Sequence, residues 1–466
     1  MASPSSPLPH LLLFPYPAQG HMLPLLDLTH FLASYGFPIT VLVTPKNLPI
    51  LQPLLSAHPA VQTLVLPFPS VPGLPPGVEN IKDIGNEGNV PIIVALRQLQ
   101  DPIVAWFKSH PSPPSAIISD FFLGWTQSLA QKLQIPRVSF FSSGCWVVDV
   151  LDYCWRHVPS EEFRKSPVKH MAELPNSPSF TNQDLPEFAT AYRDSDPLFS
   201  TIRADWFEAR TCWAHVFNTF DELEPEYLEF YRKLNNNKNV FGVGPLSLVK
   251  GHNPTVESSS DEVLKWLDER PDGSVLYISF GSQKQLNQQQ MEALASGIEK
   301  SGTRFVWVVK TIRQTDGGSD GIPIGFEDRV SGRGMVVKRW VPQEAILRHR
   351  AVRGFLSHCG WNSILESLAS GVPIFAWAME GDQMMNSKIL VDQIGVAVQV
   401  CHGDNSVPDP DQLGEVLAES FNSDKLKAKA RALSKAVADA TGPNGSSLRN
   451  LQEFAKKLAS LPPPTK

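Results

Sequence analysis

Residues 340–383 read WVPQEAILRHRAVRGFLSHCGWNSILESLASGVPIFAWAMEGDQ, and the alternation of apolar runs with a helical segment in this stretch predicts an α/β fold. An apolar run at 352–357 predicts a buried strand, and a helix is predicted over 361–370, with Gly371 as its C-terminal cap. A second apolar run at 373–378 follows almost without a spacer. Strand, helix and strand in this order indicate a parallel βαβ unit.

The start of this predicted helix is suited to a phosphate, because a helix N-terminus offers unpaired N–H groups and the positive end of the dipole. His358 precedes it, and Asn362 and Ser363 lie in its first turn. Glu366 shares the face of these two residues one turn deeper, where a carboxylate could accept both hydroxyls of a ribose. Trp340 offers a flat apolar face for a base.

Asp382 and Gln383 follow the second strand, and their side chains suit sugar hydroxyls. Base, ribose, diphosphate and hexose thus each have a candidate partner within one βαβ unit. Any one of these residues alone is more often a packing or surface group. The inference therefore depends on the ordered set.

The segment resembles the carboxy-terminal signature of plant UDP-sugar-dependent glycosyltransferases of secondary metabolism, family 1. The matching positions are Trp340, Pro342, Gln343, His358, Cys359, Gly360, Trp361, Asn362, Ser363, Glu366, Pro373, Asp382 and Gln383. The similarity extends along nearly the whole chain. It implies an α/β fold of GT-B architecture, in which two Rossmann-like doubly wound domains face each other across a cleft.

Length and composition agree with such an organisation. A chain of 466 residues favours two domains, and 42% hydrophobic with 19% charged residues is typical of a soluble globular protein. A net charge of −6 without a basic stripe argues against a nucleic-acid partner. Five scattered cysteines predict reduced thiols and a cytoplasmic protein, and no apolar stretch is long enough for a membrane span. We expect a monomer.

Strand and helix signals alternate along the chain, as in doubly wound sheets. Strands are predicted at 10–15, 39–44, 61–67, 115–119, 137–141, 212–219, 275–280, 304–310 and 334–338, and helices at 22–35, 94–108, 125–132 and 288–300. Residues 159–205 are predicted to form an irregular, mobile insertion, and 411–461 to be mostly helical.

Four segments are expected. They are an acceptor-binding domain (1–245), a linker (246–262), a UDP-sugar-binding domain (263–445) and a final helix that packs back on the first domain (446–466).

The acceptor hydroxyl needs a base with a pKa near the working pH, and His21 after the first strand fits. An aspartate on its other ring nitrogen would fix the tautomer, and Asp120 could serve if the fold brings the first and fourth strands together. A histidine in a glycine-containing link is more often structural. The resemblance nevertheless implies that His21 is the base and Asp120 its partner.

Further site residues follow from where ligands bind in open α/β sheets. Ligands of open α/β sheets bind outside the carboxyl ends of the strands, which adds Ser282 and the backbone at Gly281 for phosphate. The predicted donor-binding residues are Ser282, Trp340, Val341, Gln343, His358, Trp361, Asn362, Ser363, Glu366, Asp382 and Gln383. The candidate acceptor-binding residues are Gln19, Phe121, Phe122, Ser142 and Trp146.

The resemblance implies inverting transfer of a hexose to a small phenolic acceptor such as a flavonoid, without a metal ion or other cofactor. Gln383 goes with glucose donors in the family, although rhamnose, xylose and glucuronic acid stay open. The chain departs from the family pattern at Val341, where alanine is usual, and at Ala378, where proline is frequent. The second departure leaves the donor choice less secure.

Other classes have weaker signals. Residues 194–196 and 409–411 match the loose DxD pattern of metal-using transferases, and 317–321 match GxSxG within a polar loop. No GxGxxG follows a predicted strand, and no GxxxxGK[ST] occurs. A nucleotide-sugar isomerase and a non-catalytic UDP-sugar-binding protein remain as alternatives.

Overall fold

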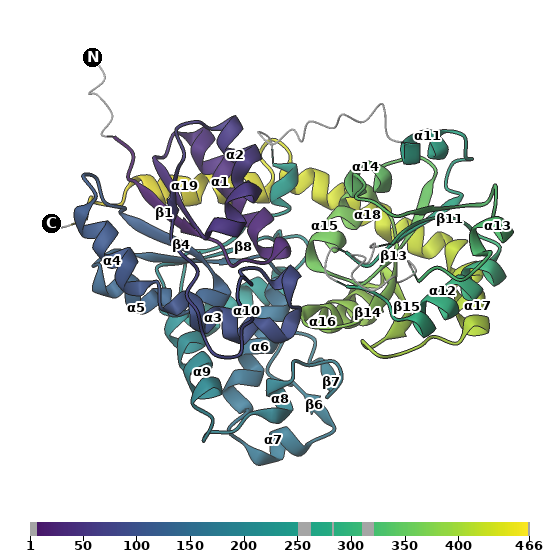
Figure 1. Cartoon of the computed structure of the whole chain (residues 1–466), viewed down its shortest axis with the longest axis horizontal. Coiled ribbons are helices and arrows are strands. Elements are labelled where there is room, and N and C mark those ends of the chain that lie inside the picture. Colours follow the sequence, from purple (N-terminus) through teal and green to yellow (C-terminus); the bar gives the residue numbers. More distant parts are fainter. Residues whose placement is uncertain (1–6, 250–261, 282–283, 310–320, 465–466) are drawn as a thin grey trace. The chain divides into compact units, whose positions relative to one another are not determined.

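The computed structural model describes residues 7–249, 262–281, 284–309 and 321–464. The chain divides into two compact units (Figure 1). Unit 1 comprises residues 1–179, 187–252 and 439–466, and unit 2 comprises residues 180–186 and 253–438.

Unit 1 is built on a seven-stranded parallel sheet in the order β3-β2-β1-β4-β5-β8-β9. The strands are β1 (Leu11–Phe14), β2 (Ile39–Val43), β3 (Gln62–Val65), β4 (Ala116–Asp120), β5 (Arg137–Phe141), β8 (Ala214–Phe217) and β9 (Val240–Gly242). The order reverses between β1 and β4. In doubly wound sheets this reversal is where ligands bind.

Both faces of this sheet are buried, as expected of parallel strands that read as continuous apolar runs. Leu11 and Leu13 face one hydrophobic core, and Leu12 and Phe14 face another. The covering helices are α1 (Gln19–Tyr35), α2 (Gln52–Ala57), α3 (Asn89–Arg97), α4 (Gln100–Ser109), α5 (Thr126–Lys132), α6 (Cys145–His157), α10 (Pro225–Asn235) and α19 (Ser446–Ala459).

The final helix α19 belongs to unit 1. Its apolar residues Leu451, Phe454 and Leu458 are fully buried in the same core as Leu11. Ser447 Oγ donates to Gly244 O at 2.5 Å, so the helix is also tied to the chain just after β9.

Unit 2 repeats the arrangement with a six-stranded parallel sheet in the order β12-β11-β10-β13-β14-β15. The strands are β10 (Val275–Ser279), β11 (Arg304–Val308), β12 (Gly334–Val337), β13 (Val352–Ser357), β14 (Ile374–Ala378) and β15 (Ala397–His402). The helices that begin in this unit are α11 (Glu262–Asp268), α12 (Gln288–Ser301), α13 (Phe326–Arg329), α14 (Gln343–Leu347), α15 (Trp361–Ser370), α16 (Asp382–Ile389), α17 (Pro410–Phe421) and α18 (Asp424–Thr441). The reversal here lies between β10 and β13.

The predicted fold class of two doubly wound α/β domains is confirmed, whereas several element boundaries were wrong. The helix predicted over 94–108 is two helices, α3 and α4. Pro102 explains the break, because its ring would clash with the carbonyl of Gln98 in a continuous helix. Helix α1 begins at Gln19 rather than Met22, so His21 lies in its first turn and not in a link before it.

The segment predicted as an irregular insertion contains short regular elements. They are α7 (Glu161–Lys165), β6 (Val168–His170), β7 (Ser179–Thr181), α8 (Phe188–Ala191) and α9 (Pro197–Ala209). Part of the predicted linker is also regular, since a 3₁₀ helix spans Leu246–Leu248 and Leu246 is buried in unit 1. Residues 250–261 of that linker lie outside the described residues.

Candidate active site

One group of the predicted site residues lies in unit 1, where the strand order reverses. β1 pairs with β4, with Leu13 beside Ile118, so the segments that follow these two strands lie together. His21 stands in the first turn of α1, and Asp120 is the last residue of β4. His21 Nδ1 lies 2.9 Å from Asp120 Oδ2. The imidazole is 19% exposed and the carboxylate fully buried, so one end of the pair can meet a ligand.

The Asp120 carboxylate is held by a second interaction. Its other oxygen, Oδ1, accepts the Phe122 N–H at 2.9 Å, which caps the 3₁₀ turn Phe121–Leu123. The buried Arg137 guanidinium donates through Nη2 to the Asp120 backbone carbonyl at 3.4 Å. The carboxylate therefore keeps its orientation toward His21.

Aromatic rings surround the His21 imidazole. Phe121 stacks on it at a centroid distance of 5.6 Å, Phe122 lies at 4.7 Å, and Tyr16 meets it edge-on at 5.3 Å. Burial, with a further effect of the Asp120 charge, raises the pKa of the Tyr16 hydroxyl well above its usual range. Apolar walls weaken solvent screening and strengthen the His–Asp interaction.

The other acceptor candidates differ in exposure. Gln19 is the first residue of α1 and is half-buried, as is Phe122. Ser142 and Trp146 are 5% and 1% exposed. The Trp146 backbone N–H donates to buried Glu224 at the start of α6. Trp146 thus packs inside unit 1 and presents little surface to a ligand.

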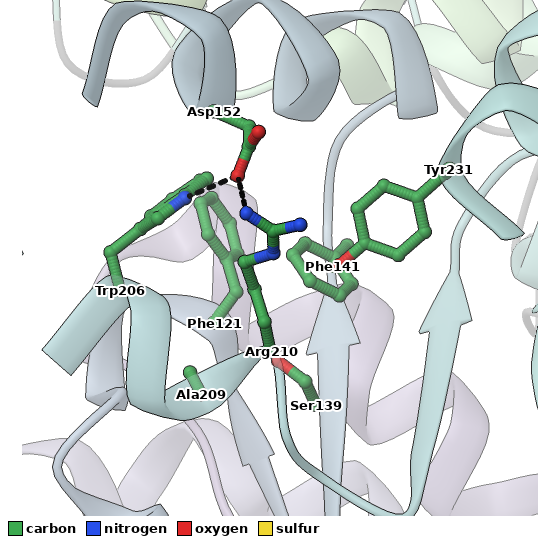
Figure 2. A pocket seen from close by; sticks show the side chains of 8 residues that line it. All are labelled: Phe121, Ser139, Phe141, Asp152, Trp206, Ala209, Arg210 and Tyr231. Atoms are coloured by element: carbon green, nitrogen blue, oxygen red, sulfur yellow. Dashed lines mark hydrogen bonds and ion pairs between the residues drawn. The ribbon is translucent and has the colours of Figure 1, made fainter. Parts of the chain in front are cut away.

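A small cavity in unit 1 lies beside Phe121 (Figure 2). It has room for about one water molecule. Its lining is Phe121, Ser139, Phe141, Asp152, Trp206, Ala209, Arg210 and Tyr231. The Asp152 carboxylate accepts from Arg210 Nη1 at 2.8 Å and from Trp206 Nε1 at 3.3 Å. Of these residues only Phe121 was predicted, and Asp152, Trp206, Ala209 and Tyr231 lie on α6, α9 and α10, helices that the sequence did not predict.

A second group of the predicted site residues lies in unit 2, and the first of them follow β12. Trp340 is 79% exposed and Val341 is 5% exposed. A large exposed aromatic side chain is unusual, and its ring face suits a nucleobase. Gln343 begins helix α14. The predicted base-binding position is therefore exposed, as that role requires.

Gln343 connects several of the predicted donor residues. Its Nε2 donates to Glu366 Oε2 at 2.7 Å and to Ser363 Oγ at 3.0 Å. The buried Tyr277 hydroxyl donates to Gln343 Oε1 at 3.1 Å and so fixes which way the amide faces. Burial raises the pKa of Glu366 to about 7, and the Gln343 hydrogen bond opposes this shift. Tyr277 was not predicted, because its hydrogen bond to Gln343 forms only where β10 and α14 lie close together in the fold.

His358 follows β13, beside the start of α15. A Cβ atom added at Gly281 or Gly360 would lie 2.8 or 2.6 Å from the imidazole, so two glycine backbones enclose the ring. His358 Nδ1 is buried and has no hydrogen-bond partner among the described residues. Burial lowers the pKa of His358 to about 4, which keeps the ring neutral at neutral pH. Ser282, predicted for the same phosphate, lies outside the described residues.

The remaining donor candidates lie on the first turns of two helices. Trp361 and Asn362 begin α15 with Gly360 at the N-cap, and Trp361 is buried while Asn362 is half-buried. Asp382 and Gln383 begin α16, a helix that the sequence did not predict. Gln383 Oε1 accepts the N–H groups of Met379 and Glu380, both at 3.3 Å. Its amide nitrogen is thereby directed away from its own loop.

The competing motifs have structural explanations. Asp196 and Asp409 are N-caps, of α9 and α17, and accept backbone N–H groups there. Across the described ranges, no three His, Cys, Asp or Glu side chains gather as metal ligands would. No helix in the same ranges is long and apolar enough to cross a membrane. Residues 317–320 of the GxSxG match lie outside the described residues.

Comparison with known proteins shows which family has this sequence and fold. Residues 251–439 match the family model described as UDP-glucoronosyl and UDP-glucosyl transferase. UDP-glycosyltransferase 89A2 of Arabidopsis thaliana is 48% identical over 98% of both chains. The chain belongs to the UDP-glycosyltransferase family. A flavonol 3-O-glucosyltransferase of Arabidopsis thaliana is 44% identical over 97% of this chain and 96% of the relative.

Solved members of the family share the fold. The crystal structure of Arabidopsis thaliana UGT89C1 complexed with quercetin aligns with a TM-score of 0.78 at 34% identity, covering 97% of this chain and 100% of the other. A complex of the same protein with UDP-L-rhamnose gives the same TM-score at 33% identity. The predicted resemblance and the predicted enzyme class, a UDP-glycosyltransferase, are therefore confirmed.

Proposed function

We propose that the protein transfers glucose from UDP-glucose to a hydroxyl group of a flavonoid or similar small phenolic, with inversion at the anomeric carbon. The His21–Asp120 pair carries the proposal, because a UDP-sugar-binding protein would not need a buried carboxylate on a partly exposed imidazole. The 44% identical flavonol 3-O-glucosyltransferase supports the donor and the acceptor class.

On the acceptor side, His21 acts as the general base. Asp120 at Nδ1 holds the neutral ring's proton on that nitrogen and leaves the Nε2 lone pair for the acceptor hydroxyl. As the hydroxyl oxygen attacks the anomeric carbon, its proton passes to Nε2, and the carboxylate stabilises the imidazolium that forms. Half-buried Phe122 offers an apolar surface on which an aromatic acceptor would stack, whereas Phe121 is 8% exposed and its ring stacks on those of His21 and Phe141.

On the donor side, unit 2 binds UDP and stabilises it as the leaving group. Trp340 stacks on the uracil, and the backbone of Val341 makes a polar contact with the same base. Gln343 and Glu366 bind the ribose hydroxyls. The N-terminus of α15, with Asn362, Ser363 and neutral His358 as hydrogen-bond donors, offsets the charge that grows on the β-phosphate. Ser282 is assigned to the same phosphate, and Asp382 and Gln383 to the hexose hydroxyls.

The remaining parts of the proposal concern metal, assembly and location. The groups above stabilise the leaving diphosphate in this scheme, which assigns no role to a metal ion. We also propose that the protein is a monomer that acts in the cytoplasm. All five cysteines are free thiols, which agrees with a reducing compartment.

Rhamnose is the second candidate donor sugar. A flavonol 7-O-rhamnosyltransferase of Arabidopsis thaliana is 36% identical over 98% of this chain, so the fold accommodates that donor in a relative. Xylose is a third donor that the proposal leaves to experiment. Gln383 favours glucose by the family rule. A nucleotide-sugar isomerase would use the same donor half without an acceptor.

One assay separates these functions. The protein is incubated with UDP-glucose, UDP-rhamnose or UDP-xylose, with and without quercetin, and UDP and products are followed by chromatography and mass spectrometry. UDP release that requires quercetin and yields a quercetin glucoside supports the proposal. An altered UDP-sugar formed without quercetin would indicate an isomerase, and binding without turnover would indicate a binding protein.

A further inference from the structure

One buried amide in unit 2 connects two of the loops described above. Asn386 lies on α16, is fully buried, and takes part in no predicted contact with a substrate. Its Nδ2 donates to the Cys359 carbonyl at 3.1 Å and to Asp382 Oδ2 at 2.9 Å. The two protons of a single amide nitrogen therefore join the turn after β13 to the start of the helix after β14.

The Cys359 end of this connection has an unfavourable backbone conformation. Cys359 has φ 63°, in the left-handed region that non-glycine residues rarely adopt. Its N–H donates to Ser357 Oγ at 3.1 Å, and its carbonyl accepts from Asn386. Both peptide groups of the residue are thus held by buried side chains. This turn carries His358 on one side and the N-cap of α15 on the other, so its shape sets the diphosphate-binding geometry.

The Asp382 end sets the sugar-binding geometry. Asp382 and Asn386 are four residues apart on α16 and share a face of that helix. The hydrogen bond fixes Oδ2 of the carboxylate. Gly381, with φ 62° just before the helix, supplies the left-handed turn that delivers Asp382 from β14. Without Asn386, the carboxylate would lose the buried donor that orients it.

We propose that Asn386 is a positioning residue that holds the diphosphate-binding turn and the sugar-binding helix start in one fixed arrangement for the UDP-sugar. It acts through Cys359 and Asp382 rather than by touching the donor. This inference rests on the proposed function, because it takes Asp382 and the start of α15 as donor contacts. Its consequence is specific: loss of the amide weakens donor binding and leaves acceptor binding unchanged, since the acceptor residues lie in unit 1.

Asn386→Leu tests the inference, because it keeps the approximate size of the side chain, adds no charge and removes both donated protons. The measurements are the Kd of UDP-glucose by calorimetry, the KM of donor and acceptor, and the melting temperature. We expect the Kd and the donor KM to rise about 10- to 100-fold, with the acceptor KM unchanged. This range corresponds to the cost of leaving buried hydrogen-bond acceptors without their donor. A donor Kd equal to that of the wild type would overturn the inference.

Two further variants separate positioning from general stability. Ile389→Val alters a buried residue at the opposite end of the same helix from Asp382; we expect a lower melting temperature with an unchanged donor Kd. If Asn386→Leu gives no folded protein, Asn386→Ala carries the same test, and an unchanged donor Kd in that folded variant would also overturn the inference. Failure of the wild type to bind UDP-glucose would instead reject the proposed function.

Discussion

The first six strands of the unit 1 sheet follow the same spatial order as the six strands of unit 2, yet the histidine at the strand ends has a different environment in each unit. In unit 1, His21 is partly exposed and lies 2.9 Å from a buried carboxylate. In unit 2, His358 is enclosed between two glycine backbones, its buried Nδ1 has no partner among the described residues, and its pKa is lowered to about 4.

The difference shows how one residue type serves two purposes. A neighbouring carboxylate stabilises the imidazolium, so His21 is suited to accept a proton during a reaction. Enclosure without a counter-charge penalises the imidazolium, so His358 stays neutral and can donate a hydrogen bond to a phosphate without titrating near neutral pH. The end of each parallel sheet positions the histidine, and the groups packed around its ring determine whether the charged imidazolium is stabilised.

The largest expected effect follows from removing the base. We expect His21→Ala to lower kcat by about 10²–10⁴-fold with an unchanged UDP-glucose Kd, because general-base catalysis is lost while unit 2 is intact. Turnover and calorimetry measure the two quantities. His30→Ala, on the same helix α1, is the control and should retain activity. Near-normal turnover of His21→Ala would reject the assigned role.

The next effect concerns the exposed ring of unit 2. We expect Trp340→Ala to weaken UDP binding about 5- to 150-fold, the range of one base-stacking contact, with little change in melting temperature because the ring is 79% exposed. Calorimetry with UDP checks this. Ile324→Ala, at an even more exposed apolar residue, should leave the affinity unchanged. Equal affinities of both variants and the wild type would contradict uracil stacking.

A smaller effect should appear as a pH dependence of donor binding. Glu366 has a raised pKa of about 7, so lowering the pH through this value neutralises the carboxylate that accepts the ribose hydroxyls. We expect the UDP-glucose affinity to fall by about tenfold from pH 8 to pH 6. His358 is neutral over this range and should add nothing. At pH 8 the Glu366→Gln variant should bind UDP-glucose more weakly than the wild type, and its affinity should not change with pH. If the variant keeps the pH dependence, the carboxylate of Glu366 is not its cause.

The smallest expected effect is that of chelation. The proposal gives the stabilisation of UDP to the start of α15 and to His358, so adding excess EDTA should leave the initial rate of transfer unchanged. Restored Mg²⁺ or Mn²⁺ after dialysis serves as the control. A rate that falls with EDTA and returns with the metal would show that a cation takes part in departure of the diphosphate.

Much of unit 2 could be predicted because local signals agreed with the tertiary structure. The strand at 352–357 and the helix at 361–370 have the predicted bounds. Gly371 has φ 68° and caps the helix as expected, since a left-handed C-cap favours glycine. The resemblance implied the pairing of His21 with Asp120, and the two side chains are in contact because β1 and β4 are neighbours in the sheet.

Other features depend on contacts that no local pattern records. Trp146 was assigned to the acceptor from its residue type, but it packs inside unit 1. Tyr277 and Asn386 matter because their hydrogen bonds join segments far apart in sequence, Tyr277 to Gln343 and Asn386 to Cys359. The start of α1 was placed too late because Pro17 and Gly20 look like turn residues, although the helix already includes Gly20.

A matched pair of substitutions tests the contrast between the two histidines most directly. His21→Gln and His358→Gln each replace an imidazole by a neutral amide that can donate a hydrogen bond but cannot serve as a base. Donor Kd and kcat at saturating donor are measured for both. We expect His21→Gln to lose kcat by about 10²–10⁴-fold with its Kd intact, and His358→Gln to keep most of its kcat and weaken Kd by at most about tenfold. Equal losses of kcat in the two variants would show that the two histidines do not have different roles.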